Sequence, residues 1–385
     1  MFIYLPLERK NMNFSYWELK SLITDSEFVI AGAGITGLCA ALELRRLNPE
    51  ARILVLERGK LPSGGSTKNA GFACFGSLSE MLDDAKSLGE TGVLNLVEMR
   101  WKGLLNLRNL LGDKALAYQD CGNYELFRDE DHIIENECLS NINHWNSLLS
   151  DIVGNQTFKL LTPQQKKEAG ISPSFKSAIF NQFEGKLHSG AMMQALLDKC
   201  REEKINVWFG FEIKGFEELG TALEIQLEEG TIRCNQLLIA TNAFAKQLLP
   251  DLAIKPARNQ VILTSVIPQN PWKSAYHIDR GYFYFREIDG RILIGGGRHL
   301  AGEAEYTSEL GNTPEVKTHL INLLDNYILT DIPYQIDMEW SGILGLGPDR
   351  SVILKRISNR VSCGVRMGGM GVAIGSVIGQ RLAGL

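Results

Sequence analysis

The sequence predicts an α/β protein with a Rossmann-like nucleotide-binding domain. An apolar run at Glu27–Ala31, a helical pattern over Ile35–Leu47 and a second apolar run at Arg52–Leu56 form a βαβ unit. A G-x-G-x-x-G pattern over residues 32–37 stands at the first strand-to-helix turn. Hydrophobic residues make up 44% and charged residues 22% of the 385 residues, which excludes disordered and fibrous classes.

Each glycine of the pattern has a separate task. Gly32 permits the tight turn, Gly34 lets the backbone approach a pyrophosphate, and Gly37 lets helix and strand pack closely. Phosphates are expected at the N-terminus of the helix, where free N–H groups and the helix dipole favour anions. Glu57 ends the second strand, placed to accept hydrogen bonds from ribose hydroxyls and to disfavour a 2′-phosphate.

Composition excludes several other classes. The formal charge of −5, without a run of Lys or Arg, argues against nucleic acid and anionic membranes as partners. The seven scattered cysteines contain no C-x-x-C pair and predict free thiols in a reducing compartment. The six dispersed histidines give no support to a metal site. The N-terminus lacks the order of a signal peptide, and the longest apolar stretch, 28–44, is too short for a membrane span. We therefore expect a cytoplasmic protein.

The glycine fingerprint leaves FAD and NAD as alternatives, and features at both ends of the chain favour FAD. A polar, glycine-rich loop follows the acidic residue over Glu57–Phe72, where a nicotinamide enzyme usually enters its next βαβ unit. A second glycine cluster opens the segment Gly364–Leu385 and precedes a helical run that ends at Leu382. Its helix N-terminus can direct its dipole at the pyrimidine end of a flavin.

The remaining elements follow from periodicity and capping. The expected helices are Ser79–Leu111, Glu130–Leu149, Pro163–Lys167 with Thr162 as N-cap, and Ser189–Glu203. The expected strands are Ile205–Phe211, 211–217, 222–228 and Gln236–Ala240, and Ser265–Asn270 is expected to be a loop.

A hairpin is predicted within Gly281–His299, because Asp289-Gly290 separates two strand-like runs. This turn sets Arg286 opposite Leu293. One face then carries Tyr282, Tyr284, Arg286 and Leu293, and the other carries Phe283, Phe285, Ile292 and Ile294. The second face belongs to the core. The first face has glycines opposite its phenols, which leaves room for a ligand.

The chain resembles the FAD-dependent oxidoreductase family of D-amino-acid oxidase, glycine oxidase and sarcosine oxidase. The motifs that carry the resemblance are GAGITG (32–37), ERG (57–59), GGSTKNAG (64–71), IATNAF (239–244), DGRILIGGGR (289–298), GPD (347–349) and RMGGMGVAIG (366–375). The resemblance implies a discontinuous FAD-binding domain over 26–78, 177–252 and 338–385. It also implies a substrate domain with a mostly antiparallel sheet over 79–176 and 253–337, after an N-terminal extension over 1–25.

The fingerprint and the resemblance together name the expected site residues. Those expected to bind FAD are Gly32, Gly34, Ile35, Thr36, Gly37, Glu57, Arg58, Gly65, Ser66, Thr67, Lys68, Asn69, Ala70, Gly71, Ile213, Thr241, Asn242, Gly342, Arg366, Gly369, Met370, Gly371 and Val372. In relatives, the sheet face over the flavin holds the substrate carboxylate. The expected substrate contacts are therefore Tyr282, Tyr284 and Arg286, with Arg258, Gln260 and Trp340 as further candidates.

Three departures from the family pattern bear on the chemistry. Gly342 stands where one branch has a flavin-linked cysteine, so non-covalent FAD is expected. Leu293 stands where that branch has a lysine implicated in oxygen activation, which favours a dehydrogenase over an oxidase. Leu344 stands where the glycine-oxidase branch has a carboxylate-binding arginine, so any carboxylate contact must come from elsewhere.

The reaction that these features predict is oxidation of the C–N bond of a small amine or amino acid, by hydride transfer to flavin N5 and hydrolysis of the imine. No obligate acid–base residue is visible in the sequence. The alternatives are a flavin dehydrogenase with an acceptor other than oxygen, a tRNA-modifying relative, a nicotinamide-linked dehydrogenase and a flavin-binding protein without turnover.

Overall fold

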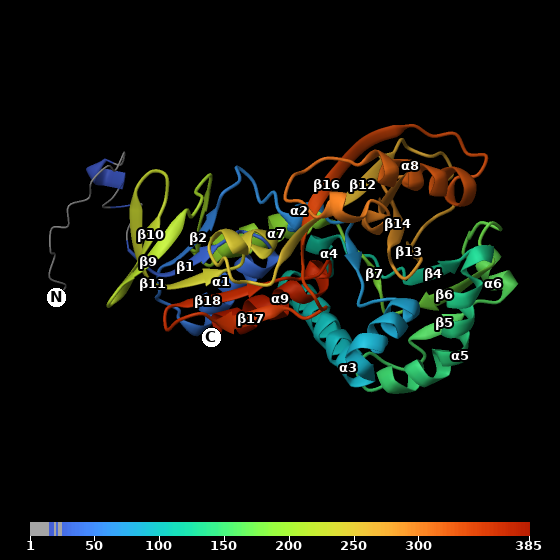
Figure 1. Cartoon of the computed structure of the whole chain (residues 1–385), viewed down its shortest axis with the longest axis horizontal. Helices are drawn as coiled ribbons and strands as arrows, with labels where there is room; N and C mark the ends of the chain where they lie inside the picture. The colour runs from blue at the N-terminus through green and yellow to red at the C-terminus, as the bar shows by residue number, and fades with distance from the viewer. Residues whose placement is uncertain (1–14, 19–20, 22–24) are drawn as a thin grey trace.

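The computed structural model describes residues 15–18, 21 and 25–385. The N-terminal extension expected over residues 1–25 lies largely outside these residues. Two eight-stranded sheets lie side by side along the long axis of the molecule (Figure 1). This architecture confirms the predicted α/β fold class. None of the helices in the described ranges has both the length and the apolar character that crossing a bilayer requires.

The first sheet contains the predicted βαβ unit. Its strands, in spatial order, are β17 (Ile353–Arg356), β18 (Val361–Val365), β11 (Thr231–Ile239), β1 (Ser26–Ala31), β2 (Ile53–Glu57) and β8 (Asn206–Phe209). Pairing from β18 to β8 is parallel, and β17 is antiparallel to β18. The hairpin of β9 (Gly215–Leu219) and β10 (Ala222–Gln226) continues from the first half of β11. The strand predicted over 211–217 therefore begins four residues later than expected.

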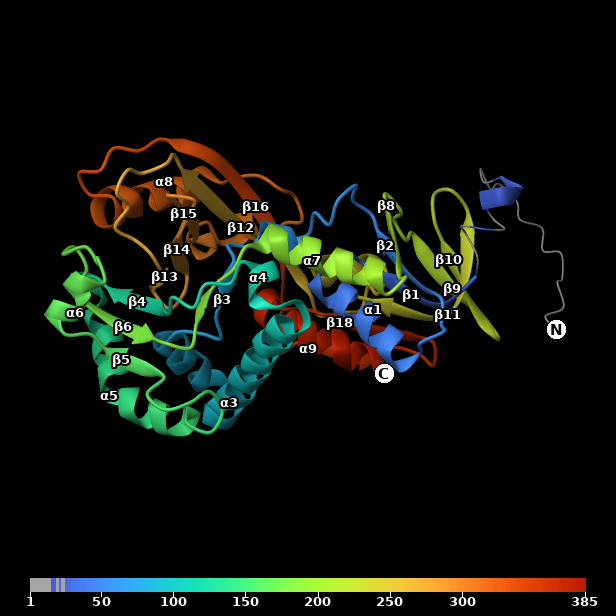
Figure 2. The same ribbon diagram turned by 180° about the vertical axis from the view of Figure 1, so that it is seen from behind.

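Apolar residues cover both faces of this sheet, as expected for buried parallel strands. One face packs against α1 (Ile35–Leu47), α7 (Ser189–Glu202) and α9 (Gly371–Ala383), and Ile30 and Val55 contribute to that core. The opposite face, with Val29 and Leu54, packs against the β9–β10 hairpin and residues 245–254. Figure 2 shows α1 and α7 on the same side of the sheet. The sheet is thus fixed from both sides, which holds its carboxyl edge in place.

The second sheet is antiparallel except where β13 pairs with β4. Its order is β16 (Ile336–Leu346), β12 (Lys255–Thr264), β15 (Arg291–Gly296), β14 (Phe283–Ile288), β13 (Ala275–Ile278), β4 (Asn123–Phe127), β6 (Ser177–Asn181) and β5 (Phe158–Leu160). The predicted boundaries at 177 and 338 do not follow the sheets, because β6 and β16 both belong to this one.

Helices cover the second sheet and connect it to the first. The helices are α3 (Leu78–Leu111), α4 (Asp113–Leu116), α5 (His132–Leu149), α6 (Pro163–Glu168) and α8 (Pro314–Leu323); the short α2 (Gly65–Lys68) lies in the loop after β2. The long α3 is kinked at Gly89 (φ 68°) and crosses α9 at Gly103, where a Cβ would overlap the Ala373 carbonyl oxygen. The Ser376 hydroxyl donates to the Gly103 carbonyl at 2.6 Å. This crossing joins the two halves of the molecule. The strands β3 (Phe72–Ala73) and β7 (Gly185–Lys186) form a small ribbon between them.

Candidate active site

A cavity of about 330 Å³ lies at the carboxyl ends of β1, β2 and β11. Here the strand order changes direction, because β1 has β2 on one side and β11 on the other. Ligands of open α/β sheets bind at such switch points. The cavity is lined by the glycine turn at 32–36, by Glu57 and Arg58, by the loop around α2 and by the start of α9.

The three fingerprint glycines differ in their surroundings. Gly32 has φ +101°, and a Cβ there would lie 3.0 Å from the Ala240 carbonyl oxygen. A Cβ on Gly37 would overlap the Gly32 carbonyl oxygen, so this glycine permits the close approach of helix and turn. Gly34 faces the cavity, and its Cβ would meet only the side chain of Ser66, with the hydroxyl at 3.0 Å. The tight turn and the close packing predicted for Gly32 and Gly37 are therefore confirmed.

Glu57 is fixed at the edge of the cavity by two backbone groups. Its Oε2 accepts from the N–H of Ala33 at 3.1 Å and its Oε1 from the N–H of Gly59 at 2.9 Å. Each carboxylate oxygen keeps a further lone pair for another donor. The Arg58 guanidinium stacks over the Phe244 ring at 3.8 Å. An oriented acid beside a flat cation–aromatic pair suits the ribose and base of an adenosine.

Further groups in the wall of the cavity fit the rest of an FAD molecule. Thr241 Oγ1 is buried there and has no hydrogen-bond partner among the described residues, so a ligand group could satisfy it. Gly371 and Val372 bring the N-terminus of α9 to the cavity wall, and the first N–H groups of a helix have no partners within it. Together with Glu57 and the Arg58–Phe244 pair, these donors fit a long, anionic cofactor.

Most residues expected to bind FAD line this cavity. They are Gly32, Gly34, Ile35, Thr36, Glu57, Arg58, Gly65, Ser66, Lys68, Asn69, Ile213, Thr241, Asn242, Gly369, Gly371 and Val372. Ala70, Gly342 and Met370 line a second cavity instead. Gly37, Thr67, Gly71 and Arg366 line neither. The Arg366 guanidinium is turned away to Asp349, Ser351 and the Ala253 carbonyl, so this side chain does not reach either cavity.

The second cavity has a volume of about 180 Å³ and adjoins the first. Both cavities are lined by Gly65, Lys68, Asn69, Leu344, Gly369 and Val372. The expected substrate contacts Tyr282 and Tyr284 line it, and the Tyr284 hydroxyl accepts from Asn259 Nδ2 at 2.8 Å. Burial raises the pKa of Tyr284, so the phenol stays protonated at neutral pH. A flavin ring at the shared wall would face these phenols.

The hairpin has the predicted register, but Arg286 does not reach the second cavity. Ile288 pairs with Arg291 and Arg286 with Leu293. Arg286 is 4% exposed, and its Nη1 donates to the carbonyls of Gly71 and Leu187, both at 2.7 Å. Arg286 therefore does not make the expected contact with a substrate carboxylate. Instead, it connects the end of the cofactor loop to the second sheet.

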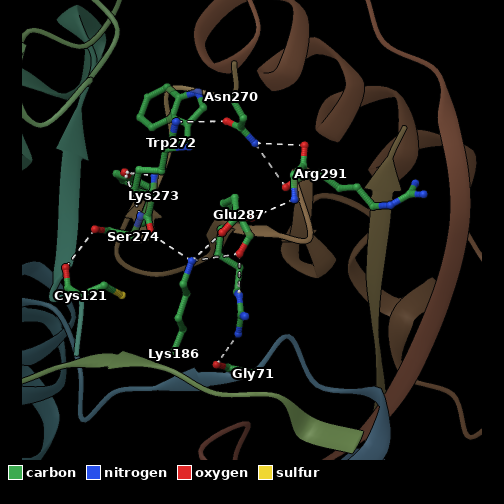
Figure 3. Close-up of polar contacts among 12 residues, drawn as sticks. Gly71, Cys121, Lys186, Asn270, Trp272, Lys273, Ser274, Glu287 and Arg291 are labelled. Carbon is green, nitrogen blue, oxygen red and sulfur yellow. Dashed lines mark hydrogen bonds and ion pairs between the residues drawn. The ribbon is translucent and has the colours of Figure 1, made fainter. Parts of the chain in front are cut away.

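A buried lysine extends this polar network beneath the loop. Lys186 Nζ lies 2.9 Å from Glu287 Oε2 and also donates to the Lys273 carbonyl at 2.9 Å. Figure 3 shows the Lys186 side chain pointing upwards to Glu287 and Lys273, with Gly71 below. Lys186 is 1% exposed, whereas the Glu287 side chain is 20% exposed, so solvent reaches only the carboxylate side of the pair. The network is structural.

The weaker substrate candidates also lie outside the second cavity. Arg258 pairs with Glu305, with Nη2 at 3.0 Å from Oε1, and Gln260 donates to the same carboxylate at 3.0 Å. The Trp340 indole donates to the Lys68 carbonyl at 3.0 Å, so it supports the cofactor loop from behind. These three residues stabilise loops and do not make the expected substrate contacts.

Comparison with known protein families identifies the chain. A family model described as FAD dependent oxidoreductase (DAO) matches residues 27–385. The chain belongs to the FAD dependent oxidoreductase family. It is thus an FAD-dependent oxidoreductase, as the sequence predicts.

Solved structures share the fold of this oxidoreductase across nearly its whole length. L-proline dehydrogenase from P. horikoshii is 20% identical, with a TM-score of 0.74, over 94% of this chain and 93% of that one. Glycine oxidase from Geobacillus kaustophilus is 17% identical, with a TM-score of 0.73, over 92% and 93%. Iminodiacetate oxidase from Chelativorans sp. BNC1 is 19% identical, with a TM-score of 0.74, over 93% and 94%. No curated protein matches the chain.

The oxidoreductase also carries polar side chains in the second cavity that the sequence did not single out. They are Glu80, His277, Arg280, Arg298 and Arg350. Burial lowers the pKa of His277 to about 4, and its Nδ1 lies 2.9 Å from Asn123 Nδ2. His277 is therefore neutral at pH 7. Of these, Arg298 alone had a sequence signal, because it closes the motif DGRILIGGGR.

Proposed function

We propose that this oxidoreductase oxidises the C–N bond of a small amine or amino acid and binds FAD without a covalent link. The observation that carries the proposal is the second cavity, which adjoins the cofactor cavity along a shared wall and combines phenols, guanidiniums and one carboxylate. Proteins of the same fold are named L-proline dehydrogenase, glycine oxidase and iminodiacetate oxidase, which supports an amine or amino acid as substrate.

Bound FAD would supply a two-electron acceptor, taking hydride at N5 from the carbon that bears the amine. Hydride loss requires the neutral amine, so a substrate bound as an ammonium would first lose one proton to water. Loss of a second proton from the iminium would give the imine, which water converts to a carbonyl compound and an amine or ammonia. Tyr282 and Tyr284 would orient the substrate against the shared wall. Glu80 is the carboxylate among the described residues of this cavity and would hold the substrate's ammonium group.

Gly342 and the thiols support non-covalent binding. A Cβ on Gly342 would lie 3.1 Å from Lys68 Cβ, so this position has little space for a longer side chain. Cys74 lines the second cavity but is 8% exposed, and burial raises its pKa well above that of a free thiol. A protonated thiol is a poor nucleophile.

A dehydrogenase is the second candidate, because Leu293 stands where one branch of the family has a lysine implicated in oxygen activation. Leu293 is 4% exposed on β15, opposite Arg286, and lines neither cavity, whereas Lys68 supplies a cation at the wall that the cavities share. An artificial electron acceptor and oxygen should therefore be compared directly as oxidants of the reduced protein.

The test is an anaerobic panel of amines and amino acids added to the purified holoprotein. At least one compound should remove the visible flavin absorbance and yield the matching carbonyl product. Persistent flavin colour with every compound, in a protein that dithionite bleaches normally, would refute the proposed function.

A further inference from the structure

Three arginines from separate turns line the second cavity. Arg280 lies between β13 and β14, Arg298 follows β15, and Arg350 lies between β16 and β17. Lys68 adds a fourth positive charge at the shared wall. Against these charges stands Glu80, whose Oε1 is 3.8 Å from Arg100. Asp83 and Asp279 lie beside Arg280 and Asp84 lies beside Arg350, outside the residues that line the cavity.

These arginines are incompletely paired within the protein. Arg298 has neither a hydrogen bond nor an ion pair from its guanidinium to any described residue. Arg280 lies 3.9 Å from Asp83 and 3.8 Å from Asp279, too far for hydrogen bonds. Arg350 Nε lies 3.1 Å from Asp84 Oδ1, which leaves its terminal nitrogens available. Each guanidinium has five N–H donors, so several donors at this cavity have no hydrogen-bond acceptor among the described residues.

Arg298 is in the least favourable position of the three. Burial lowers its pKa, and the positive charge of Arg350 lowers it further. The guanidinium carbon lies 5.9 Å from the Tyr282 ring, a weak compensation for lost water. Because a half-buried cation without an anion is unfavourable, an anionic ligand group is the natural partner of Arg298.

One carboxylate is not enough for three guanidiniums. A carboxylate has two oxygens, which one arginine can occupy in a bidentate pair. Arg280 and Arg350 come from the turns before β14 and before β17, and each has an aspartate of α3 beside it, Asp83 and Asp84 respectively. Arg298 comes from a different turn, after β15. The arrangement therefore offers two separate anion sites.

Resting on the proposed function, we propose that the substrate is an amine with two carboxylate groups. Arg298 binds one carboxylate, in place of the arginine that Leu344 replaces, and Arg280 and Arg350 share the other. Glu80 faces the ammonium group between them. The volume of about 180 Å³ restricts this substrate to a small acidic amino acid or an iminodicarboxylate.

The first test measures binding of compounds that cannot be oxidised. Malonate, succinate and glutarate are titrated into the holoprotein beside propionate, butyrate and valerate, which match them in carbon number. Perturbation of the flavin spectrum and calorimetry report the dissociation constants. At least one dicarboxylate should bind tenfold or more tightly than its monocarboxylate partner. Equal affinities in all three pairs would overturn the inference.

The second test assigns the two sites. Arg298→Gln should weaken binding of monocarboxylates and dicarboxylates alike, whereas Arg350→Gln should weaken only dicarboxylates and so reduce their advantage. Arg298→Lys should restore part of the affinity. Arg201→Gln, a control with the same charge change at a side chain 76% exposed, should alter neither. Flavin content and thermal stability are measured for each variant. An unchanged dicarboxylate advantage in Arg350→Gln would contradict the assignment.

The outcomes separate this inference from the proposed function. Flavin reduction by monocarboxylic amino acids, without any preference for dicarboxylic ones, would overturn the inference and leave the proposed function standing. Tight dicarboxylate binding without flavin reduction by any amine would overturn the proposed function. It would also overturn the inference that the substrate is a dicarboxylic amine. Faster flavin reduction by aspartate, glutamate or iminodiacetate than by alanine or glycine supports both.

Discussion

Replacing Arg286 should loosen the cofactor loop and leave substrate binding intact. Two of its hydrogen bonds, to the carbonyls of Gly71 and Leu187, are 2.7 Å long and buried. A hydrogen bond to a charged group contributes roughly 1.5–3 kcal/mol, so the two together are worth about 3–6 kcal/mol. Release from burial offsets part of this loss, since burial lowers the pKa of Arg286 to about 10. We expect Arg286→Met to reduce the free energy of unfolding by about 3 kcal/mol.

The assays are urea unfolding of the apo-protein, the dissociation constant of FAD, and ligand binding to the FAD-saturated protein. FAD affinity should fall about tenfold, equivalent to about 1.4 kcal/mol. Arg286→Lys should lie between wild type and Arg286→Met, because an ammonium cannot reproduce the fork of a guanidinium. The affinity for succinate at saturating FAD should stay within about twofold of wild type. Full stability and FAD affinity with lost carboxylate binding would restore the substrate role and refute the structural one.

Three further outcomes are expected. Gly34→Val should give folded protein without flavin, since Gly34 has φ −80° and its new side chain would enter the cofactor cavity; retained FAD would place the site elsewhere. Acid precipitation should release all flavin to the supernatant, and colour in the pellet would implicate Cys74. Burial raises the pKa of Glu125 to about 7, against about 4.3 unfolded, so the folded protein holds this proton and unfolding free energy should fall from pH 4 to 7 by about 3 kcal/mol. Glu125→Gln should flatten this fall, because its uncharged amide can still form hydrogen bonds with the N–H and the hydroxyl of Ser79. Unfolding curves at several pH values measure the change in unfolding free energy.

The cofactor half of the site could be predicted from the sequence because its determinants are local. The tight turn at Gly32, the helix that follows it and the acid at Glu57 lie within one βαβ unit. Turn chemistry fixed the hairpin register in the same way. Asp289 and Gly290 have φ values of 50° and 74°, and the strands beside them pair as the two-residue turn requires.

The substrate half depends on contacts that periodicity cannot specify. Alternation correctly puts Arg286 on the face with Tyr284, but the Arg286 side chain is long enough to leave that face for the carbonyl of Gly71, distant in sequence. Strand alternation predicts the face from which a side chain starts. It does not predict which distant backbone groups pack against the end of that side chain. The same holds for β6 and β16, whose partners are set by the tertiary fold.

The charge of the second cavity comes from turns, which carry no hydrophobic period. Arg280 has φ 51° and Arg298 follows Gly297, which has φ 75°, so both stand where the chain leaves the sheet. Side chains at strand ends can be exchanged without disturbing the ladder of backbone hydrogen bonds. Leu344, by contrast, lies within β16 and packs at the wall shared with the cofactor cavity. A guanidinium supplied from the turns can therefore replace one lost from the strand, and the cavity keeps its affinity for anions while the geometry of recognition changes.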